Sequence, residues 1–517
     1  MITVAIYVFR KSWSGDNRLL QAAILIFIPG ILKCIEKPWA LKKASINSLV
    51  DSSNASKIGK EDSIDSIEKF VQAAVKYFQG NQRWDGQAQS KPYYRFVDIA
   101  TPYSFRLQFI KFLLWPENDA HDLMKYGLSE TFDRLYTKEQ VHVGLINCIE
   151  ECDPKRCCGH LLRSVIIYLI FAAIWIFNTS RIEGYSDIDV KVTYILLCCT
   201  AALEFIAINL KHAVDCIGFI CGMPWPDQVA QYNLIGYLAR NKKHSWVRKL
   251  ATLLVCKDYL DQLWCMKPCE SSRDITKLVQ IYLIKGWTEH IKDMNTYREF
   301  NDNRGHWTLK TKGCHGKTMK RILQKPFDES VVLWHLATDF CFYHLHTSPS
   351  QVTARRCREI SNYMVYLLFV NPEMMMPGAR RGLFKDAYGE IEGKVKESPS
   401  RDEDELAHNI IKKIEGTAGP GSIHCAWALA QELLGICKEG VEREEKMWEV
   451  IQGVWVEMLC FSAGWCRGYL HAKSLGKGGE YLSYIWMLQS YMGMESLTER
   501  MQRMDLQEGR DGGDENV

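Results

Sequence analysis

The chain has 517 residues, with 64 Lys or Arg against 61 Asp or Glu, so its formal charge is +3. This length exceeds one compact core and predicts two or three domains. The near balance of charge argues against nucleic acid as a partner, because phosphate binding needs a concentrated basic face. Nineteen cysteines, an odd number in a long chain, favour reduced and buried thiols over a disulfide framework.

The chain opens with two apolar stretches. Residues 1–9 read MITVAIYVF and residues 19–32 read LLQAAILIFIPGIL. The second is short for a helix that crosses a hydrocarbon core, which takes roughly 20 residues. No basic segment precedes the first, which argues against a signal peptide. We expect residues 1–43 to be an incomplete transmembrane region that earlier spans precede.

Two longer apolar segments follow, at 161–177 (LLRSVIIYLIFAAIWIF) and 192–210 (VTYILLCCTAALEFIAINL). Because each approaches the length of a membrane span, residues 161–210 are predicted to form a transmembrane hairpin. Basic outer flanks favour the cytoplasm for both ends, with the connector 178–191 on the opposite side. The alternative is a buried hairpin of a soluble protein. Glu204 lies inside the second segment, where a carboxylate must face other helices or be protonated.

Helical periodicity dominates the rest of the chain. Helices are predicted at 67–78, 117–135, 246–264, 331–345, 360–370, 423–435, 442–464 and 480–491. Residues 299–326 are basic and rich in Gly and Lys, which predicts a loop or a strand pair. The fold class is therefore mainly α, with a few transmembrane helices (an N-terminal apolar segment and a helical hairpin) joined to a large α-helical cytoplasmic region.

These patterns divide the chain into eight segments. They are an N-terminal apolar segment (1–43), a flexible linker (44–66), a cytoplasmic segment (67–160), the transmembrane hairpin (161–210), a helical cytoplasmic domain (211–390), a charged linker (391–406), a C-terminal helical domain (407–500) and a disordered acidic tail (501–517).

A cluster of thiols and one imidazole precedes the hairpin: Cys148, Cys152, Cys157, Cys158 and His160. Such groups are zinc ligands, but their spacings of three, four and zero residues do not match a zinc knuckle. Cysteines beside a membrane helix are also palmitoylation sites. Unmodified thiols are the third alternative and the one that we favour, so neither a metal nor a cofactor is predicted.

Residues 313–318 read GCHGKT, which is similar to the end of a phosphate-binding loop. Such a loop needs another glycine five positions before the glycine of its final Gly-Lys-Thr, so that successive N–H groups surround the phosphates. Thr311 occupies that position, and no apolar strand precedes the motif. We therefore predict no phosphate site here.

His335 and Asp339 are four residues apart in a predicted helix and would share one face, and His344 and His346 follow them. A pair of this kind can act as a general base or bind a metal. No His-Glu-x-x-His motif and no nucleophile motif accompany it. We favour a helix whose polar residues contact another helix, and keep an enzyme as an alternative.

Glu457 and His471 are polar residues in apolar surroundings near the C-terminus. Buried polar groups need hydrogen-bond partners and can set the register of helices. We expect this structural role for both and keep them as site candidates. The glycines of 476–479, followed by Glu480, resemble a loop that leads to a helix N-terminus, where the carboxylate would complement the helix dipole.

Several stretches resemble a known family, among them WPDQVAQYNLIGY (225–237), VVLWHLATDFCFY (331–343) and the pattern around HAKSLGKGGEYLSYIW (471–486). Together they are similar to a plant family of membrane proteins that is abundant in grasses. Its members carry domain of unknown function 4220 and a small C-terminal domain of unknown function 594. The resemblance implies a plant source and an integral membrane protein, and it brings no catalytic residues.

The sequence thus predicts an integral protein of the plasma membrane or an endomembrane, with most of the chain in the cytoplasm. Its expected partners are the lipid bilayer and a protein, and its expected role is non-enzymatic interaction or scaffolding. One alternative is a transport component that uses Glu204, and another is an enzyme that uses His335 and Asp339.

Overall fold

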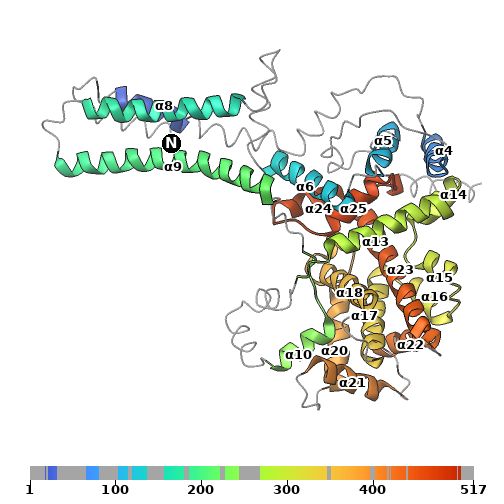
Figure 1. The fold of residues 1–517 in the computed structure, drawn as a ribbon. Helices are drawn as coiled ribbons and strands as arrows, with labels where there is room; N and C mark the ends of the chain where they lie inside the picture. The colour runs from blue at the N-terminus through green and yellow to red at the C-terminus, as the bar shows by residue number, and fades with distance from the viewer. Residues whose placement is uncertain are drawn as a thin grey trace, which may run out of the picture. The chain divides into compact units, whose positions relative to one another are not determined.

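In a computed structural model the protein is mainly α-helical, as predicted (Figure 1). The structure describes residues 18, 21–31, 66–80, 103–114, 119–136, 157–179, 186–221, 228–243, 268–345, 351–395, 402–415, 419, 421–437, 441–497 and 499–501. Within these ranges the β-structure is limited to one isolated antiparallel bridge, between Val229 and Cys269.

The chain divides into two compact units. Unit 1 comprises residues 1–56 and 131–224, and unit 2 comprises residues 57–130 and 225–517. Unit 2 therefore takes in the predicted C-terminal domain 407–500 and residues 225–390 of the predicted domain 211–390, while residues 211–224 fall in unit 1.

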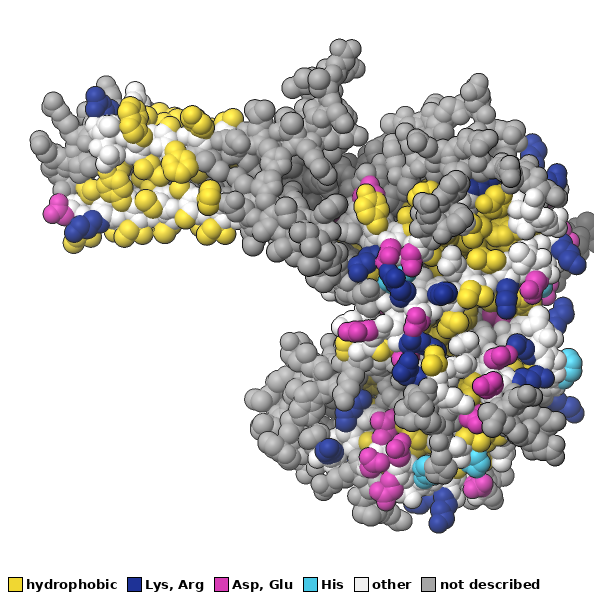
Figure 2. Space-filling model, in the orientation of Figure 1, with side chains coloured by type: hydrophobic (Ala, Val, Ile, Leu, Met, Phe, Trp, Pro, Cys, Tyr) yellow, Lys and Arg dark blue, Asp and Glu magenta, His cyan; other side chains and the backbone are white. Residues whose placement is uncertain are grey.

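Unit 1 contains helix 21–31 and two long helices, α8 (Cys157–Thr179) and α9 (Asp187–Cys221). One buried apolar cluster of this unit consists of Ala22, Phe177 and Leu197, one residue from each helix. Much of the remaining apolar surface of α8 and α9 is exposed (Figure 2). No helix among the residues that the structure describes has the length and apolar character needed to cross a membrane.

The other helices belong largely to unit 2. They are α4 (Ile67–Phe78), α5 (Tyr103–Leu113), α6 (Ala120–Tyr136, which contains a unit boundary), α10 (Leu234–Lys243), α13 (Ser272–Lys285), the π-helix η2 (Gly286–His290), α14 (Met294–Asn301), α15 (His306–Thr311), α16 (Lys317–Leu323), α17 (Phe327–His344), α18 (Val352–Val370), α19 (Pro372–Met375), α20 (Gly382–Val395), α21 (Glu403–Ile414), α22 (Ser422–Leu434), the short 3₁₀ helix η3 (Gly435–Cys437), α23 (Val441–Trp465), α24 (Gly468–Leu475) and α25 (Leu482–Tyr491).

The core of unit 2 is built around α17. Apolar residues lie on all sides of this helix, which is typical of a helix that is surrounded by others, and nearly all of its side chains are buried. It packs against α18 and α22, α18 packs against α23, and α23 packs against α25. Trp334 and Trp455 are fully buried in this core, so the C-terminal helices form part of the same core as α17.

Most of the predicted helices lie close to observed ones. Helix α4 has the predicted bounds, and Ser66 caps it by accepting a hydrogen bond from the backbone N–H of Lys69. Helix α18 ends before Asn371, as predicted from the following proline. The prediction for 299–326 is wrong, because α15 and α16 are helices. The predicted helix 246–264 and the acidic tail from residue 502 onward lie outside the described residues.

Three helices of unit 2 begin after a glycine and are capped by a glutamate from another helix. Such a glycine has no side chain that could accept hydrogen bonds from the free N–H groups of the first turn. The carboxylates of Glu457, Glu432 and Glu390 accept these bonds at the starts of α15, α16 and α22. Each remote carboxylate also lies at the positive end of a helix dipole.

Nine cysteines whose side chains the structure describes are free. Five are buried: Cys314, Cys341, Cys357, Cys460 and Cys466. Within the described part of the chain, these thiols pack as small apolar side chains, as the sequence predicts for most of them.

Candidate functional site

His335 is held on both sides of its ring. Its Nε2 accepts a hydrogen bond from the backbone N–H of Leu234 at 3.3 Å, and its Nδ1 lies 2.8 Å from the hydroxyl oxygen of Ser361. This arrangement requires the neutral ring with the proton on Nδ1. Burial lowers the pKa of His335, which outweighs the opposite effect of Asp339. Since both nitrogens are engaged, His335 fixes the start of α10 against α17 and α18.

Asp339 lies one turn further along α17 and is also buried. Its carboxylate is 3.8 Å from His335 but has closer partners. Oδ1 accepts from Nε of Arg358 at 3.0 Å, and Oδ2 accepts from Nδ2 of Asn233 at 2.6 Å. The predicted His–Asp pair therefore shares a helix face, but each member bonds mainly to other helices.

Arg358 extends from this buried carboxylate toward the surface. Its Nη2 donates to the hydroxyl of Tyr343 at 2.8 Å and to Glu403 at 3.2 Å, and Tyr343 donates to the same carboxylate at 2.5 Å. The guanidinium also lies 4.3 Å from the ring centre of Phe342, a cation–π contact. Burial works to lower the pKa of Arg358, but the charge of Asp339 more than offsets it and raises that pKa.

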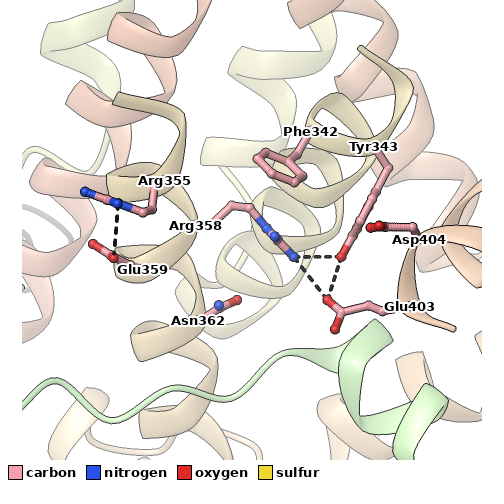
Figure 3. A pocket seen from close by; sticks show the side chains of 8 residues that line it. All are labelled: Phe342, Tyr343, Arg355, Arg358, Glu359, Asn362, Glu403 and Asp404. Atoms are coloured by element: carbon pink, nitrogen blue, oxygen red, sulfur yellow. Dashed lines mark hydrogen bonds and ion pairs between the residues drawn. The ribbon is translucent and has the colours of Figure 1, made fainter. Parts of the chain in front are cut away.

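These residues form one wall of a pocket of about 360 Å³ between α17, α18 and α21 (Figure 3). Tyr343 and Glu403 point toward Arg358, while Arg355 and Glu359 face each other on another side. The pocket is lined by Phe342, Tyr343, Arg355, Arg358, Glu359, Asn362, Glu403 and Asp404.

The pocket carries a surplus of negative charge. Two arginines and three carboxylates line it, and Asp339 lies directly behind Arg358, which leaves a formal charge of −2. Arg356 binds Glu359 from outside the pocket but is itself paired with Asp274, so the surplus is unchanged. A site of this kind is suited to a cationic group, such as a Lys or Arg side chain of another protein.

Glu457 lies deep in unit 2 and does not contribute to this pocket. Its carboxylate accepts from the N–H of Gly305 at 2.6 Å, and from the N–H and hydroxyl of Thr308 at 2.6 and 2.5 Å. Burial raises the pKa of Glu457 to about 7, although these hydrogen bonds act to lower it. The geometry assigns Glu457 the capping of α15, the structural role that we expect from its apolar surroundings.

His471 joins α24 to α25. Its Nδ1 lies 2.9 Å from the hydroxyl of Ser483, and its ring stacks on Trp486 with 4.5 Å between the ring centres. Burial lowers the pKa of His471 to about 3, so the ring is neutral. Between the two helices, Gly478 and Gly479 have φ of 106° and 86°, a conformation that glycine adopts at little cost.

Glu480 completes this C-terminal motif. It accepts from the N–H of Tyr481 at 3.2 Å, next to the start of α25, as expected for a carboxylate at a helix N-terminus. It also accepts from the hydroxyl of Tyr363 at 2.9 Å and from the amide of Asn371 at 3.0 Å. The pattern that carries the family resemblance therefore connects α24, α25 and α18, and its residues have packing roles.

The phosphate-loop-like stretch 313–318 ends at the N-terminus of α16. Glu432 occupies that N-terminus and accepts from the N–H groups of Thr318 and Met319 at 2.9 and 3.0 Å. Burial acts to raise the pKa of Glu432, but these hydrogen bonds prevail and lower it. Because a carboxylate already takes the place that a phosphate would need, this turn has a structural explanation.

The remaining candidates have no described geometry. Glu204, Cys157, Cys158 and His160 lie in α9 and α8, but their side chains fall outside the described residues, as do Cys148 and Cys152 altogether. His344 is exposed beside Trp427, and His346 is not described. Among the described residues, no group of three or more His, Cys, Asp or Glu could hold a metal ion.

Arg358 and Glu403 connect the buried carboxylate to the pocket, and no sequence pattern points to either of them. The two residues are 45 positions apart in the sequence, and Glu403 lies in the segment 391–406 that is predicted as a charged linker. No local spacing links residues so far apart, so only tertiary packing reveals the pair.

Two family descriptions match the chain. Domain of unknown function (DUF4220) matches residues 1–295, which is more than half of the chain, and Protein of unknown function, DUF594, matches residues 441–494. The second match contains α24, α25 and the residues that join them. A search of curated proteins finds no match, and a search of solved structures finds none either.

Proposed function

The chain belongs to the family described as Domain of unknown function (DUF4220), and we propose that it is a non-enzymatic, membrane-anchored interaction protein of plants. In this proposal the hairpin of α8 and α9 inserts into a lipid bilayer, at the plasma membrane or an endomembrane. Unit 2 lies in the cytoplasm and binds a protein partner. The plant source rests on the sequence resemblance alone.

The exposed apolar surface of unit 1 is the observation that carries the proposal. Fifteen of the twenty large apolar side chains that are exposed in the described residues belong to unit 1. On α8 they include Tyr168 and Trp175, which are 80% and 68% exposed, and on α9 they include Leu203 at 67%. Apolar area in water costs roughly 25 cal/mol per Å², so a surface of this extent favours contact with lipid.

The groups near the connector support the same interpretation. The hydroxyl of Tyr194 donates to Asn178 at 2.8 Å, and the guanidinium of Arg18 donates to the carbonyl oxygen of Thr179 at 2.8 Å. Trp175 lies one turn before them. Trp, Tyr and Arg are the residues that favour the interface between lipid and water, so we place this end of the hairpin at a membrane surface.

The pocket at α17, α18 and α21 supports the second part of the proposal. A surplus of two negative charges at an open site would attract a basic side chain, while the hydrogen-bonded positions of Arg358 and Glu403 hold the binding geometry before a partner arrives. We therefore expect the partner to present Lys or Arg to this pocket.

Membrane insertion is tested on sealed microsomes that contain the full chain, with epitope tags in the connector 178–191 and at the C-terminus. We expect the protein to resist carbonate extraction, with the C-terminal tag digested from outside and the connector tag protected. Release by carbonate together with digestion of both tags would mean that the hairpin belongs to a soluble protein. The reverse protection pattern would place unit 2 on the lumenal side.

Partner binding is tested with Asp404→Lys, which reverses a charge in the pocket. The matched control is Glu415→Lys, which makes the same change in an exposed residue just after the other end of α21. With proximity labelling in cells, the first variant should lose protein neighbours that the wild type and the control retain. Identical sets of neighbours for all three would contradict a role for the pocket.

A further inference from the structure

The segment 304–325 is the most strongly charged part of the described chain. It contains seven Lys or Arg and neither Asp nor Glu, although the whole protein carries a formal charge of only +3. The structure folds this segment into α15 and α16. This segment therefore carries a local positive charge that the average composition of the chain conceals.

The spacing on α16 directs its cations to one side. Lys317, Lys320 and Arg321 have the spacing i, i+3 and i+4 and share a face of the helix. Met319 and Ile322 lie between them in sequence and are buried against the core. The buried side holds α16 in place and leaves the charged side in solvent.

Few carboxylates neutralise this charge. Within the described residues, Lys312 pairs with Glu449 and Lys325 pairs with Glu329, while Glu432 is used to cap α16. Seven cations against three carboxylates leave a surplus of about four positive charges. This surplus belongs to a surface that we call the basic face, which consists of Lys310, Lys317, Lys320 and Arg321.

All four residues of the basic face are exposed, and they form no ion pair with any residue that the structure describes. Exposed His306 and His315 lie on the same two helices or beside them. In Figure 2, Lys, Arg and His side chains lie along the edge of unit 2 that carries α15 and α16.

We propose that the basic face binds the anionic headgroups of a lipid surface. Juxtamembrane clusters of Lys and Arg are attracted to phosphatidylserine and similar lipids, because several weak Coulomb interactions add up at a charged surface. The inference rests on the proposed function, in which the chain is anchored to a lipid bilayer. The surplus is local and confined to two short helices, which favours a headgroup surface over a long nucleic acid.

The first test measures the accessibility of the basic face in the full, purified chain. An amine-reactive reagent labels lysines, and mass spectrometry follows Lys317 and Lys320, with exposed Lys385 and Lys473 as internal controls. We expect vesicles of phosphatidylcholine with phosphatidylserine to slow labelling of the first pair several-fold relative to phosphatidylcholine alone. High salt should restore the rate, because it screens Coulomb attraction. Equal labelling in both kinds of vesicle would overturn the proposal.

The second test uses charge reversal. Lys317→Glu with Lys320→Glu should reduce the preference of the chain for phosphatidylserine vesicles over phosphatidylcholine vesicles about 10-fold or more, whereas Lys385→Glu with Lys473→Glu should leave this preference unchanged. Equal losses in both double variants would mean that net charge, not the basic face, governs association. Stronger protection of the lysines by single-stranded RNA than by vesicles of equal phosphate content would assign the face to nucleic acid instead.

Carbonate extraction separates this inference from the proposed function. If carbonate releases the chain but anionic vesicles still protect Lys317 and Lys320, the basic face binds lipid headgroups and the proposed insertion of the hairpin is wrong. If the chain resists carbonate but both lysines label equally in all vesicles, the hairpin inserts and the basic face does not bind lipid headgroups.

Discussion

Glu457 and His471 are buried ionisable residues whose pKa values are shifted by the same cause. Burial disfavours the charged form, so it raises the pKa of the Glu457 carboxyl to about 7 and lowers that of the His471 ring to about 3. Over mildly acidic pH the two groups change the unfolding free energy in opposite directions. Comparing wild type with single variants separates them.

For Glu457, the folded-state pKa lies above the usual value of 4.5. The folded protein therefore keeps a proton that the unfolded chain releases, and stability falls as pH rises from about 4.5 to 7. Glu457→Gln removes this dependence, and it loses one hydrogen bond because its amide faces the N–H of Gly305. We expect its stability deficit relative to wild type to shrink by about 3 kcal/mol between pH 5 and 8.

We test this by unfolding the full chain with urea in detergent at several pH values and monitoring the unfolding by tryptophan fluorescence. A deficit for Glu457→Gln that stays constant across this range would show that the carboxyl titrates alike in the folded and unfolded chain. Glu449→Gln, at an exposed position of the same helix, is the control and should show little pH dependence.

For His471 the unfolding free energy changes with pH in the opposite direction. The unfolded chain takes up a proton below about pH 6.5, while the folded protein does not, so stability falls as pH falls. His471→Phe keeps an aromatic ring against Trp486 and cannot titrate. Between pH 6.5 and 4.5, the wild type should lose about 2–3 kcal/mol relative to this variant. Urea unfolding at the same pH values measures this difference. Unfolding free energies of wild type and His471→Phe that change in parallel with pH would contradict a neutral, buried His471.

At the scale of elements, the starts of α15, α16 and α22 depend on carboxylates that other helices supply. A helix of six or seven residues is marginal by itself, and the glycine before it contributes no capping side chain. The remote glutamate satisfies N–H groups and ties the short helix to the core. This explains why the sequence predicts a loop or a strand pair at 299–326. The helices in this segment carry few local signals, because side chains of α22 and α23 stabilise them.

Gly316→Ala tests this arrangement. A Cβ atom at Gly316 would lie 2.3 Å from Oε2 of Glu432, so the capping carboxylate must move. We expect a loss of roughly 1–2 kcal/mol, in the range of a lost N-cap. Gly389→Ala, in α20 with no atom within 4 Å, is the control and should stabilise by up to about 1 kcal/mol.

Urea unfolding measures both glycine variants. A double variant with Glu432→Ala distinguishes the mechanism, because Gly316→Ala should add little once the cap is gone. Full additivity of the two changes would contradict displacement of the carboxylate. In that case the loss of stability in Gly316→Ala would come from the backbone at Gly316 and not from the displaced carboxylate.

At the scale of the whole molecule, one buried ion pair joins parts of unit 2 that are 393 residues apart in sequence. Arg106 of α5 donates to both carboxylate oxygens of Glu499, at 3.0 and 2.5 Å, and both side chains are buried. Next to it, Arg500 bonds to Asp302 and to the carbonyl oxygen of Asn301. The end of the described chain is thus held against α5 and α14.

Glu499→Gln should therefore cost about 3–5 kcal/mol, because it leaves the Arg106 charge buried without its partner. Asp122→Asn is the control, since its partner Arg273 is exposed and such pairs contribute about 0–1 kcal/mol. Urea unfolding and tryptic cleavage within α5 measure the effect. Restoring most of the stability with the apolar pair Arg106→Met and Glu499→Leu would confirm the mechanism, and an equally small loss in both single variants would refute it.

The sequence by itself determined the helical class, the approximate bounds of most long helices and the family. These properties depend on local signals, namely apolar residues at spacings of three and four, Ser66 as an N-cap, and a proline after Asn371. It also showed that Glu457 and His471 stand in apolar surroundings, from which a structural role follows, since buried polar groups need partners.

Only the tertiary structure decided which partners those groups have. Arg358 and Glu403, or Arg106 and Glu499, are far apart in sequence, and no periodic pattern encodes a contact that depends on how helices pack. The same holds for the basic face, whose charge is neutralised or left exposed according to which carboxylates the fold brings near. Local sequence specifies helices because their hydrogen bonds are local, whereas a site depends on long-range contacts that form when the helices assemble.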